Sequence, residues 1–340
     1  MTKDRWGNPV SFADSAAVRG LENAILKLHA YQADPVADID AVLATHPDFA
    51  MAHAFRAGML ATATDKAFEP ELRKSVAAAE ALASGANERE LGHIAAARAW
   101  LDGDLERATE LWGRTAIAYP RDSLAIQLAH VGDFFLGYSH MLRNRVARVL
   151  PHWNRDVPGY GYVLGMYAFG LEETGEYERA EAAGREAVAL DKRDGWGAHA
   201  VAHVMEMQGR WADGAAWLTG TAAGWSPGSM FAYHNWWHVA LFHVEAGDFG
   251  AALRVFDENV SAGGFAQALE LVDGTALLWR LMLQGQDVGG RWNAVADKWA
   301  SRVDDGYYAF NDAHAMMAFV GAGRSAEQSA LLAAGERAAR

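Results

Sequence analysis

Apolar stretches of helical length recur along the chain between short polar segments, and strand-like alternation is hard to find. Ala-rich runs such as residues 76–83 and 94–99 favour helix, because alanine has the highest intrinsic helix propensity. From about residue 88 each stretch ends at a glycine, and most of these glycines precede another helical stretch. The pattern predicts an all-α chain built from helical hairpins.

The glycines that end these stretches recur at a nearly constant spacing. Successive ones lie 34 or 38 residues apart, a period typical of stacked helical hairpins. After several of them come one residue, then Leu or an aromatic residue, then two residues and a small residue. Glycine permits the turn, and the small residue lets two helices approach closely. The glycines are Gly103, Gly137, Gly175, Gly209, Gly247, Gly285 and Gly323.

This turn and second-helix start resembles the tetratricopeptide repeat. The resemblance implies an α/α superhelix of stacked hairpins, and we expect one solenoid over residues 1–340. Within it we expect irregular capping helices over 1–87, regular repeats over 88–323 and a C-terminal capping helix over 324–340. Pro, Gly and Asn concentrate in the segments where we expect longer connections, 151–161 and 220–228.

Six of the thirteen histidines fall on one face of the expected first helices. When each glycine is counted as residue 15 of its repeat, these histidines occupy positions 2, 5, 6 or 9. Such positions span roughly 100° of helix surface, and the tetratricopeptide resemblance implies that they line the concave groove. They are His93, His199, His203, His234, His238 and His314.

Two histidine pairs form the densest group. His199 and His203, and likewise His234 and His238, are four residues apart, so each pair shares a helix face. Adjacent first helices of a solenoid lie roughly 10 Å apart, so we expect the four imidazoles to converge, with Glu206 as an orienting carboxylate or ligand.

Three interpretations of this group stay open at this point. A metal such as Zn, Fe or Mn would take nitrogen and oxygen ligands, because the chain has no cysteine. Without a metal, the imidazoles would act as general acids or bases near neutral pH. In the third interpretation they are structural groups that bond to each other, water or the backbone. Metalloprotease chemistry is not supported, because no Glu directly follows His199 as it does in zincins.

Aromatic and polar side chains at groove positions complete the expected site. A small-molecule site usually needs an apolar wall beside its polar groups. Asp273 and Asp312, near the groove edge, are candidates to orient a neighbouring imidazole, whereas His130 is expected to be buried and bonded to Asp133 or another group. The expected substrate contacts are His93, His314, Trp237, Trp279, Tyr162 and Trp100.

Charge and composition limit the classes of partner that the protein is expected to bind. The net charge of −13 opposes binding to nucleic acid or to an anionic membrane, since both require a field of Lys and Arg. The one basic cluster, Arg143, Arg145 and Arg148, is expected to form a solvated or ion-paired helix face. The start of the chain has no apolar core of signal-peptide length, and no apolar run is long enough to span a membrane. We therefore expect a cytoplasmic protein.

Several segments together look like the tetratricopeptide repeat protein 38 family. The likeness covers nearly the whole chain and implies a helical repeat fold in a soluble intracellular protein, but it implies no reaction. The chain departs from the family pattern at Val131, where the family tends to have Asp, with Asp133 two residues further on. The segments include PDFAMAHA (47–54), LAHVGDFFLGY (128–138), GMYAFGLEETGEYERAEAAGREAV (165–188), YHNWWHVALFHVEAGD (233–248) and FNDAH (310–314).

Two functions follow from these expectations. The first is a small-molecule enzyme of hydrolase or lyase type, with the histidine-rich site in the concave groove. The alternative is a tetratricopeptide-type scaffold that binds a short peptide or a protein partner in the groove without catalysis. The oligomeric state is left open by the sequence.

Overall fold

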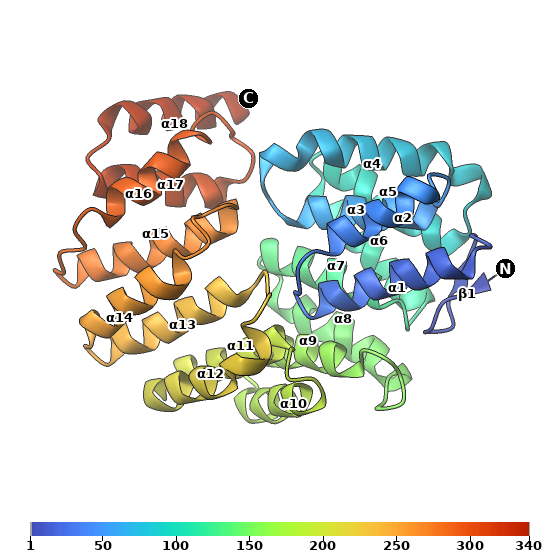
Figure 1. Ribbon diagram of the computed structural model, residues 1–340, viewed down its shortest axis with the longest axis horizontal. Coiled ribbons are helices and arrows are strands. Elements are labelled where there is room, and N and C mark those ends of the chain that lie inside the picture. Colours follow the sequence, from blue (N-terminus) through green and yellow to red (C-terminus); the bar gives the residue numbers. More distant parts are fainter. Residues whose placement is uncertain (1, 340) are drawn as a thin grey trace. The chain divides into compact units, whose positions relative to one another are not determined.

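The computed structural model describes residues 2–339 and is almost entirely helical (Figure 1), as the apolar pattern predicts. Apart from eighteen α-helices and a few short 3₁₀ and π turns, the described residues form one antiparallel pair of strands near the N-terminus, β1 (Thr2–Lys3) and β2 (Pro9–Val10). The all-α class is therefore confirmed.

Four helices precede the regular repeats. Asp14 and Asp34 cap the first two, because each carboxylate accepts hydrogen bonds from two backbone N–H groups of the first turn. Proline stands at the first position of α2, where its missing N–H costs no helical hydrogen bond. These helices are α1 (Ser15–His29), α2 (Pro35–Thr45), α3 (Ala50–Thr62) and α4 (Glu69–Ala81).

Seven helical hairpins follow from Glu88, where Asn87 forms a capping box with Glu90. Their first helices are α5 (Glu88–Leu101), α7 (Ser123–Phe135), α9 (Tyr160–Glu172), α11 (Gly195–Met207), α13 (Ala232–Glu245), α15 (Ala268–Leu283) and α17 (Ala309–Gly321). Their second helices are α6 (Leu105–Ala118), α8 (Ser139–Val149), α10 (Tyr177–Leu190), α12 (Trp211–Trp225), α14 (Phe249–Val255), α16 (Arg291–Ala300) and α18 (Ser325–Ala338).

Each of the seven predicted glycines occupies the turn inside one hairpin. Their φ angles run from +67° to +84°, the left-handed region that side chains disfavour. At Gly103 the amide of Asp104 bonds to the carbonyl of Ala99, and the amide of Gly103 bonds to the carbonyl of Trp100. This is the Schellman arrangement, which satisfies the last carbonyl groups of a helix. The constant spacing of the glycines therefore marks the places where the first helices of the hairpins end.

The small residue five positions after the turn lies where the two helices of a hairpin meet their neighbours. Ala108, Ala180 and Ala252 are completely buried. At the corresponding Gly214, an added Cβ would lie 2.3 Å from the ring of Phe242, so even alanine would not fit without movement. The close-packing role predicted for these positions is confirmed.

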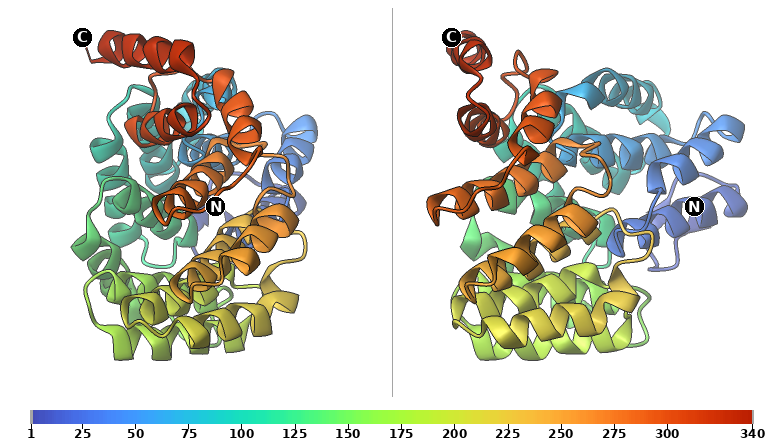
Figure 2. Two further views of the ribbon diagram at one scale, coloured as in Figure 1. Left: turned by 90° about the vertical axis from the view of Figure 1, so that its left-hand side faces the viewer. Right: turned by 60° about the vertical axis from the view of Figure 1, so that its left-hand side comes forward.

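The chain divides into two compact units. In unit 1, the first helices α5, α7, α9 and α11 belong to hairpins packed in series. In unit 2, α13, α15 and α17 pack in the same serial way, and Figure 2 shows these hairpins as successive layers. Unit 1 comprises residues 1–62, 68–208 and 221–231, and unit 2 comprises 63–67, 209–220 and 232–340. A single continuous solenoid stays a prediction.

One predicted connection is corrected by the structure. The segment 220–228 was expected to be a loop, but α12 continues through Trp225. Trp225 is completely buried, and its indole N–H donates to the Thr221 hydroxyl one turn earlier. Gly224 is required by packing rather than by a turn, because an added Cβ would lie 2.3 Å from the carbonyl oxygen of Lys192. Glycine in this segment therefore reflects close packing within a helix, and the predicted loop over 220–228 is wrong up to Trp225.

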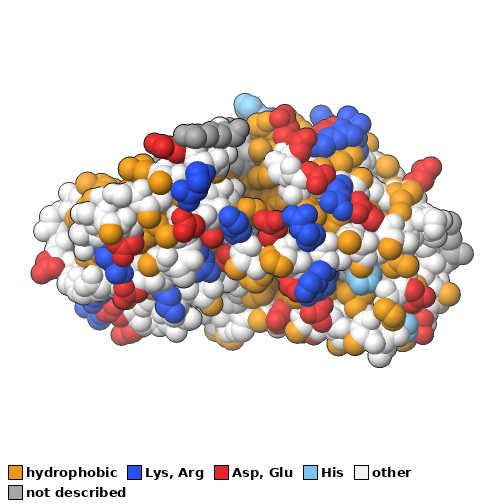
Figure 3. Space-filling model, turned by 90° about the horizontal axis from the view of Figure 1, so that it is seen from above, with side chains coloured by type: hydrophobic (Ala, Val, Ile, Leu, Met, Phe, Trp, Pro, Cys, Tyr) orange, Lys and Arg blue, Asp and Glu red, His pale blue; other side chains and the backbone are white. Residues whose placement is uncertain are grey.

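Charged side chains of both signs are interspersed over the face drawn in Figure 3. The basic cluster of α8 behaves as expected for an ion-paired face: Arg143 pairs with Glu176, and Arg145 pairs with Asp133 and Glu110.

Among the described residues, no helix combines the length and the apolar character needed to cross a bilayer.

Candidate functional site

The first histidine pair lies on α11 in unit 1. The Nε2 atoms of His199 and His203 are 2.8 Å apart, so one ring donates a hydrogen bond to the other. His199 is buried and stacks on Phe169, with ring centroids 5.3 Å apart, and it also contacts Trp196. The side chain of His203 is 24% exposed. His203 is therefore the member of the pair that a ligand can reach.

Two acidic residues at the end of α9 complete this region. The Nδ1 atom of His203 lies 3.6 Å from Oε2 of Glu172, and Glu173 is the adjacent C-cap residue. Burial raises the pKa of Glu172 to about 8, and the charges of Glu173 and Glu206 add to the effect. The candidate ligand atoms of Glu172, Glu173 and His203 all lie within 4.8 Å of one another.

Sequence reasoning missed Glu172 and Glu173. Both stand at groove positions of their repeat, 12 and 13 when Gly175 is counted as 15. That register is the signal in the sequence that marks them. Glu206, the carboxylate chosen instead, is half-buried in the last turn of α11 and acts on Glu172 through its charge. Its role as a ligand or orienting group stays a prediction.

The second histidine pair lies on α13 in unit 2. The Nδ1–H of His234 is placed to donate to Oδ2 of Asp273 on α15, at 2.7 Å. The Nε2 atom of His234 lies 3.3 Å from Nε2 of His238. The predicted role of Asp273, to orient a neighbouring imidazole, is confirmed. The three side chains form a hydrogen-bonded chain that runs from a carboxylate to a buried imidazole.

An aromatic ring and a cation surround this chain. Trp237 stacks on His234 with centroids 5.4 Å apart, and the guanidinium of Arg280 lies 5.4 Å from the Trp237 ring centre. Burial lowers the pKa of His238 well below its usual value, and the nearby His234 and Arg280 lower it further. His238 is therefore a neutral imidazole at pH 7.

The two pairs belong to different units. The structure brings His199 together with His203, and His234 together with His238. The expectation that all four imidazoles form one metal or catalytic site stays a prediction.

Two further predicted contacts lie on the first helices of unit 2. The Nδ1–H of His314 donates to the carbonyl of Phe310, and its ring lies 4.5 Å from the Phe310 ring. Trp279 contacts Trp292 edge to face, with centroids 6.4 Å apart. Asp312 lines a small pocket near Lys66 rather than pairing with an imidazole.

Three other predicted contacts in unit 1 are buried. His93 lies 2.9 Å from Asp122, the Tyr162 hydroxyl donates to Asp191 at 2.6 Å, and Trp100 packs on Trp112. Each is at most 7% exposed. Their assignment as substrate contacts therefore rests on the repeat register alone.

The N-terminal region explains much of this burial. Residues 4–32 of unit 1 lie over the groove positions of α5, α7 and α9. Ser11 N–H donates to Glu90, and His29 bonds to Gln127 and lies beside Tyr162. The Asp4 carboxylate lies 3.4 Å from the guanidinium of Arg89. The chain thus occupies with its own residues a surface that the repeat pattern alone would leave open.

His130 is expected to be buried and bonded to Asp133 or another group, and of these partners Asp133 is wrong. Asp133 accepts a hydrogen bond from Arg145 at 2.6 Å instead. His130 is buried as expected, but it packs edge-on against Phe169 and Trp196. Its burial in this apolar setting lowers its pKa to about 3. The three-residue spacing on α7 does not bring the two side chains together.

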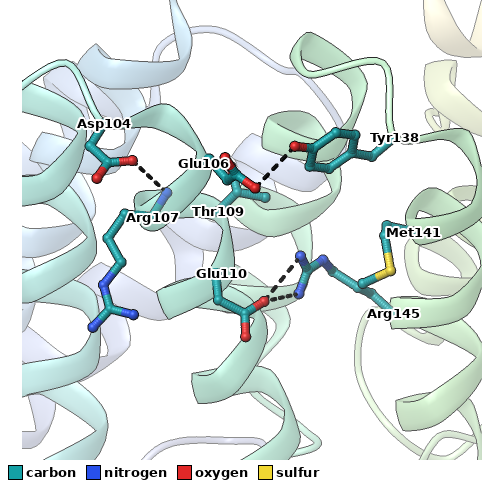
Figure 4. A pocket seen from close by; sticks show the side chains of 8 residues that line it. All are labelled: Asp104, Glu106, Arg107, Thr109, Glu110, Tyr138, Met141 and Arg145. Carbon is teal, nitrogen blue, oxygen red and sulfur yellow. Dashed lines mark hydrogen bonds and ion pairs between the residues drawn. The ribbon is translucent and has the colours of Figure 1, made fainter.

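A cavity of about 460 Å³ lies between the second helices α6 and α8 (Figure 4). There Glu106 accepts from the Tyr138 hydroxyl, and Glu110 accepts from Arg145. The remaining lining residues are Asp104, Arg107, Thr109 and Met141. Its ion pairs are satisfied internally, so we assign no ligand to it.

Comparison with known proteins supports the fold. No known family model matches the chain. The chain is similar to a Rap protein solved in complex with competence and sporulation factor, at 12% identity and a TM-score of 0.54 over 96% of this chain and 99% of that one. It is also similar to the apo form of RapI, at 9% identity and a TM-score of 0.50 over 95% of this chain and 98% of that one. These likenesses show a tetratricopeptide-like helical repeat fold, whereas the finer resemblance to the tetratricopeptide repeat protein 38 family stays a prediction.

Proposed function

We propose that this protein is a helical-repeat scaffold that binds a short, positively charged peptide segment on the groove-facing side of its first helices. The observation that carries the proposal is the pairing of a partly exposed imidazole with an acidic side chain on neighbouring first helices. In unit 2, where we place the peptide site, Asp273 holds the partly exposed His234.

This arrangement suits recognition of a chain segment. Side chains held by internal hydrogen bonds lose little conformational entropy when a ligand binds, which favours affinity. Trp237 offers an aromatic surface beside His234, and aromatic side chains are common anchors in binding interfaces. The similar Rap protein, solved in complex with competence and sporulation factor, supports a binding role for this fold.

Charge selects the class of peptide. The chain carries 43 Asp and Glu residues against 30 Lys and Arg residues. Such an imbalance steers cationic ligands toward the surface and repels acidic ones. The groove carboxylates described above have the same sign, so we expect Lys or Arg in the bound segment.

A selection from a phage-displayed peptide library, followed by calorimetry on the enriched peptides, tests the proposal. We expect enriched peptides rich in Lys or Arg, with affinity that falls as salt is added. Trp237→Ala and His234→Ala, both in unit 2, should each weaken binding about tenfold or more, as removal of an interface anchor does. Leu332→Ala, on a second helix and 63% exposed, is the control and should bind like the wild type. Peptides that bind all of these variants equally would contradict the proposal.

A second candidate is a hydrolase or lyase, favoured by the chain of hydrogen bonds from Asp273 through His234 to His238. A carboxylate that fixes the tautomer of an imidazole is a common feature of general acid–base catalysis. Turnover of ester, phosphoester or hydroxy-acid substrates that is lost in Asp273→Asn would support this alternative. Turnover that is unchanged in His234→Ala would show that these three hydrogen-bonded side chains do not catalyse the reaction.

A further inference from the structure

We infer that Glu172, Glu173 and His203 of unit 1 bind a divalent first-row transition metal ion, with two carboxylate oxygens and Nδ1 of His203 as ligands. The inference is independent of peptide binding. Each residue offers one ligand atom, and these atoms lie within 4.8 Å of one another. Ligand atoms around a bound ion are about 3 to 4 Å apart, given bond lengths near 2.1 Å, so small side-chain rotations would close the set.

The backbone places the three groups together. Glu172 is the last residue of α9 and Glu173 its C-cap, whereas His203 lies on α11, which packs against α9 within unit 1. The C-terminal end of a helix carries partial negative charge from its unpaired carbonyl groups, which attracts a cation. The C-terminal end of α9 and the two carboxylates therefore attract a positive ion to the same place.

The burial of Glu172 is the independent observation that points to a ligand. This side chain is only 5% exposed, and within the described part of the chain its Oε2 atom has no hydrogen-bond partner. A buried carboxylate oxygen without a donor is costly in free energy, because it has lost its water and gained nothing in return. The Nδ1 atom of His203 lies 3.6 Å from this oxygen. A metal ion between the two atoms would supply the missing interaction.

His199 provides the support that a histidine ligand needs. A ligating imidazole usually bonds through its second nitrogen to a group that fixes the ring. The Nε2 atom of His203 bonds to Nε2 of His199 at 2.8 Å, and His199 is held in turn by Phe169 and Trp196. This leaves Nδ1 of His203 on the side of the carboxylates.

This site differs from the one that the histidine spacing suggests. There, the imidazoles of both pairs would be the ligands and Glu206 an accessory group. Here, one imidazole and two carboxylates bind the ion, and His199 is a supporting residue. A mixed nitrogen and oxygen set with three protein ligands suits Mn²⁺ or Zn²⁺ and leaves coordination positions for water.

Titration of the metal-free protein, residues 1–340, with Mn²⁺ and separately with Zn²⁺, followed by calorimetry and by Mn²⁺ electron paramagnetic resonance, tests the inference. We expect one ion per chain for the wild type. Glu172→Gln and Glu173→Gln should each weaken binding by more than tenfold, and His199→Phe should weaken it about tenfold through the loss of support for His203. Glutamine has the shape of glutamic acid, so these variants should keep the fold, which thermal melting verifies.

Glu178→Gln is the matched control, since it removes one exposed negative charge in the first turn of α10 without removing a proposed ligand. We expect its affinity to stay within about threefold of the wild type, the range of a screened charge effect. The inference is overturned if the wild type binds neither ion, or if Glu172→Gln binds like the wild type. It is also overturned if the ion is lost only in a His234→Ala, His238→Ala double variant.

Discussion

The Nδ1 atom of His234 lies 2.7 Å from the carboxylate of Asp273, across two successive first helices of unit 2. Asp273 is nearly buried and His234 about one-fifth exposed. The bond therefore holds the partly exposed imidazole of His234 against the nearly buried carboxylate of Asp273. It also leaves Nε2 of His234 facing His238.

Asp273→Ala tests the contribution of this bond to stability. We expect a loss of about 1 to 3 kcal/mol in the free energy of unfolding, the usual range when a hydrogen bond to a charged group is lost. Urea denaturation followed by circular dichroism measures it. Asp297→Ala, which removes an exposed partner of Arg324, should cost less than about 1 kcal/mol. Equal losses in the two variants would contradict the structural role of Asp273.

Two glycines around the last hairpin should respond oppositely to alanine. Gly323 has φ = +68°, whereas Gly335 lies within α18 and has open space around its Cβ position. We expect Gly323→Ala to lower stability by about 1 kcal/mol, because L-residues pay that cost in the left-handed region. Gly335→Ala should raise it by up to about 1 kcal/mol through helix propensity. Thermal melting of both variants gives the sign of each change, and a stabilised Gly323→Ala would refute the turn assignment.

Protonation of His29 at acidic pH should lower the stability of unit 1. Burial lowers the pKa of His29 to about 4, although its bond to Gln127 and the charge of Asp122 act in the other direction. Tyr31, which also bonds Gln127, and Tyr162 are the other titratable groups against it. The unfolded chain binds this proton near pH 6.5 and the folded chain only near pH 4, so stability falls as pH drops through that window.

The expected loss from His29 is roughly 2 kcal/mol between pH 7 and pH 5. Urea denaturation at the two pH values, for the wild type and for His29→Gln, isolates it as a difference. Glutamine keeps a polar side chain near Gln127 but does not titrate. If the variant loses as much stability as the wild type on acidification, another group is responsible.

The buried ion pair between Arg89 and Asp122 should be costly to break from one side. Their side chains are 3.1 Å apart and almost completely buried, and Asp122 also bonds His93. Although burial opposes ionisation, His93 and Arg89 hold the pKa of Asp122 below its usual value. Asp122→Ala would leave Arg89 with a weakened set of partners, and we expect a loss of about 3 to 5 kcal/mol.

Asp102→Ala is the control for this prediction, since it removes an exposed partner of Arg98. Its effect should stay within about 0.5 kcal/mol, as for most surface substitutions. Chemical denaturation at pH 7 measures both variants. A small effect at Asp122 would show that the network between α5 and the start of α7 contributes little to stability.

Local signals in the sequence predicted the repeat well. A glycine with positive φ follows the end of the first helix in each of the seven hairpins, so the period of these glycines revealed the hairpins. The start of the regular region at Glu88 also follows from a local capping signal. Helical spacing placed His199 beside His203 and His234 beside His238, because a turn of helix brings residues i and i+4 together.

Tertiary structure decided what local patterns do not encode. Gly224 was mistaken for a loop residue, because its neighbour Lys192 is distant in the chain and unseen in the local sequence. The cover that residues 4–32 form over α5, α7 and α9 arises from long-range hydrogen bonds, such as that from Ser11 to Glu90. The partners of His203, namely Glu172 and Glu173, lie on another helix about thirty residues away.

The sequence by itself determined the helical repeat, the glycine turns that end its first helices and the residues that share a helix face, since these depend on backbone conformation and on spacing within a turn. Only the tertiary structure decided which of those faces stay accessible and which carboxylates meet which imidazoles. Burial and charge pairing depend on side chains that come together from distant segments, and the spacing of residues within one segment does not predict such contacts.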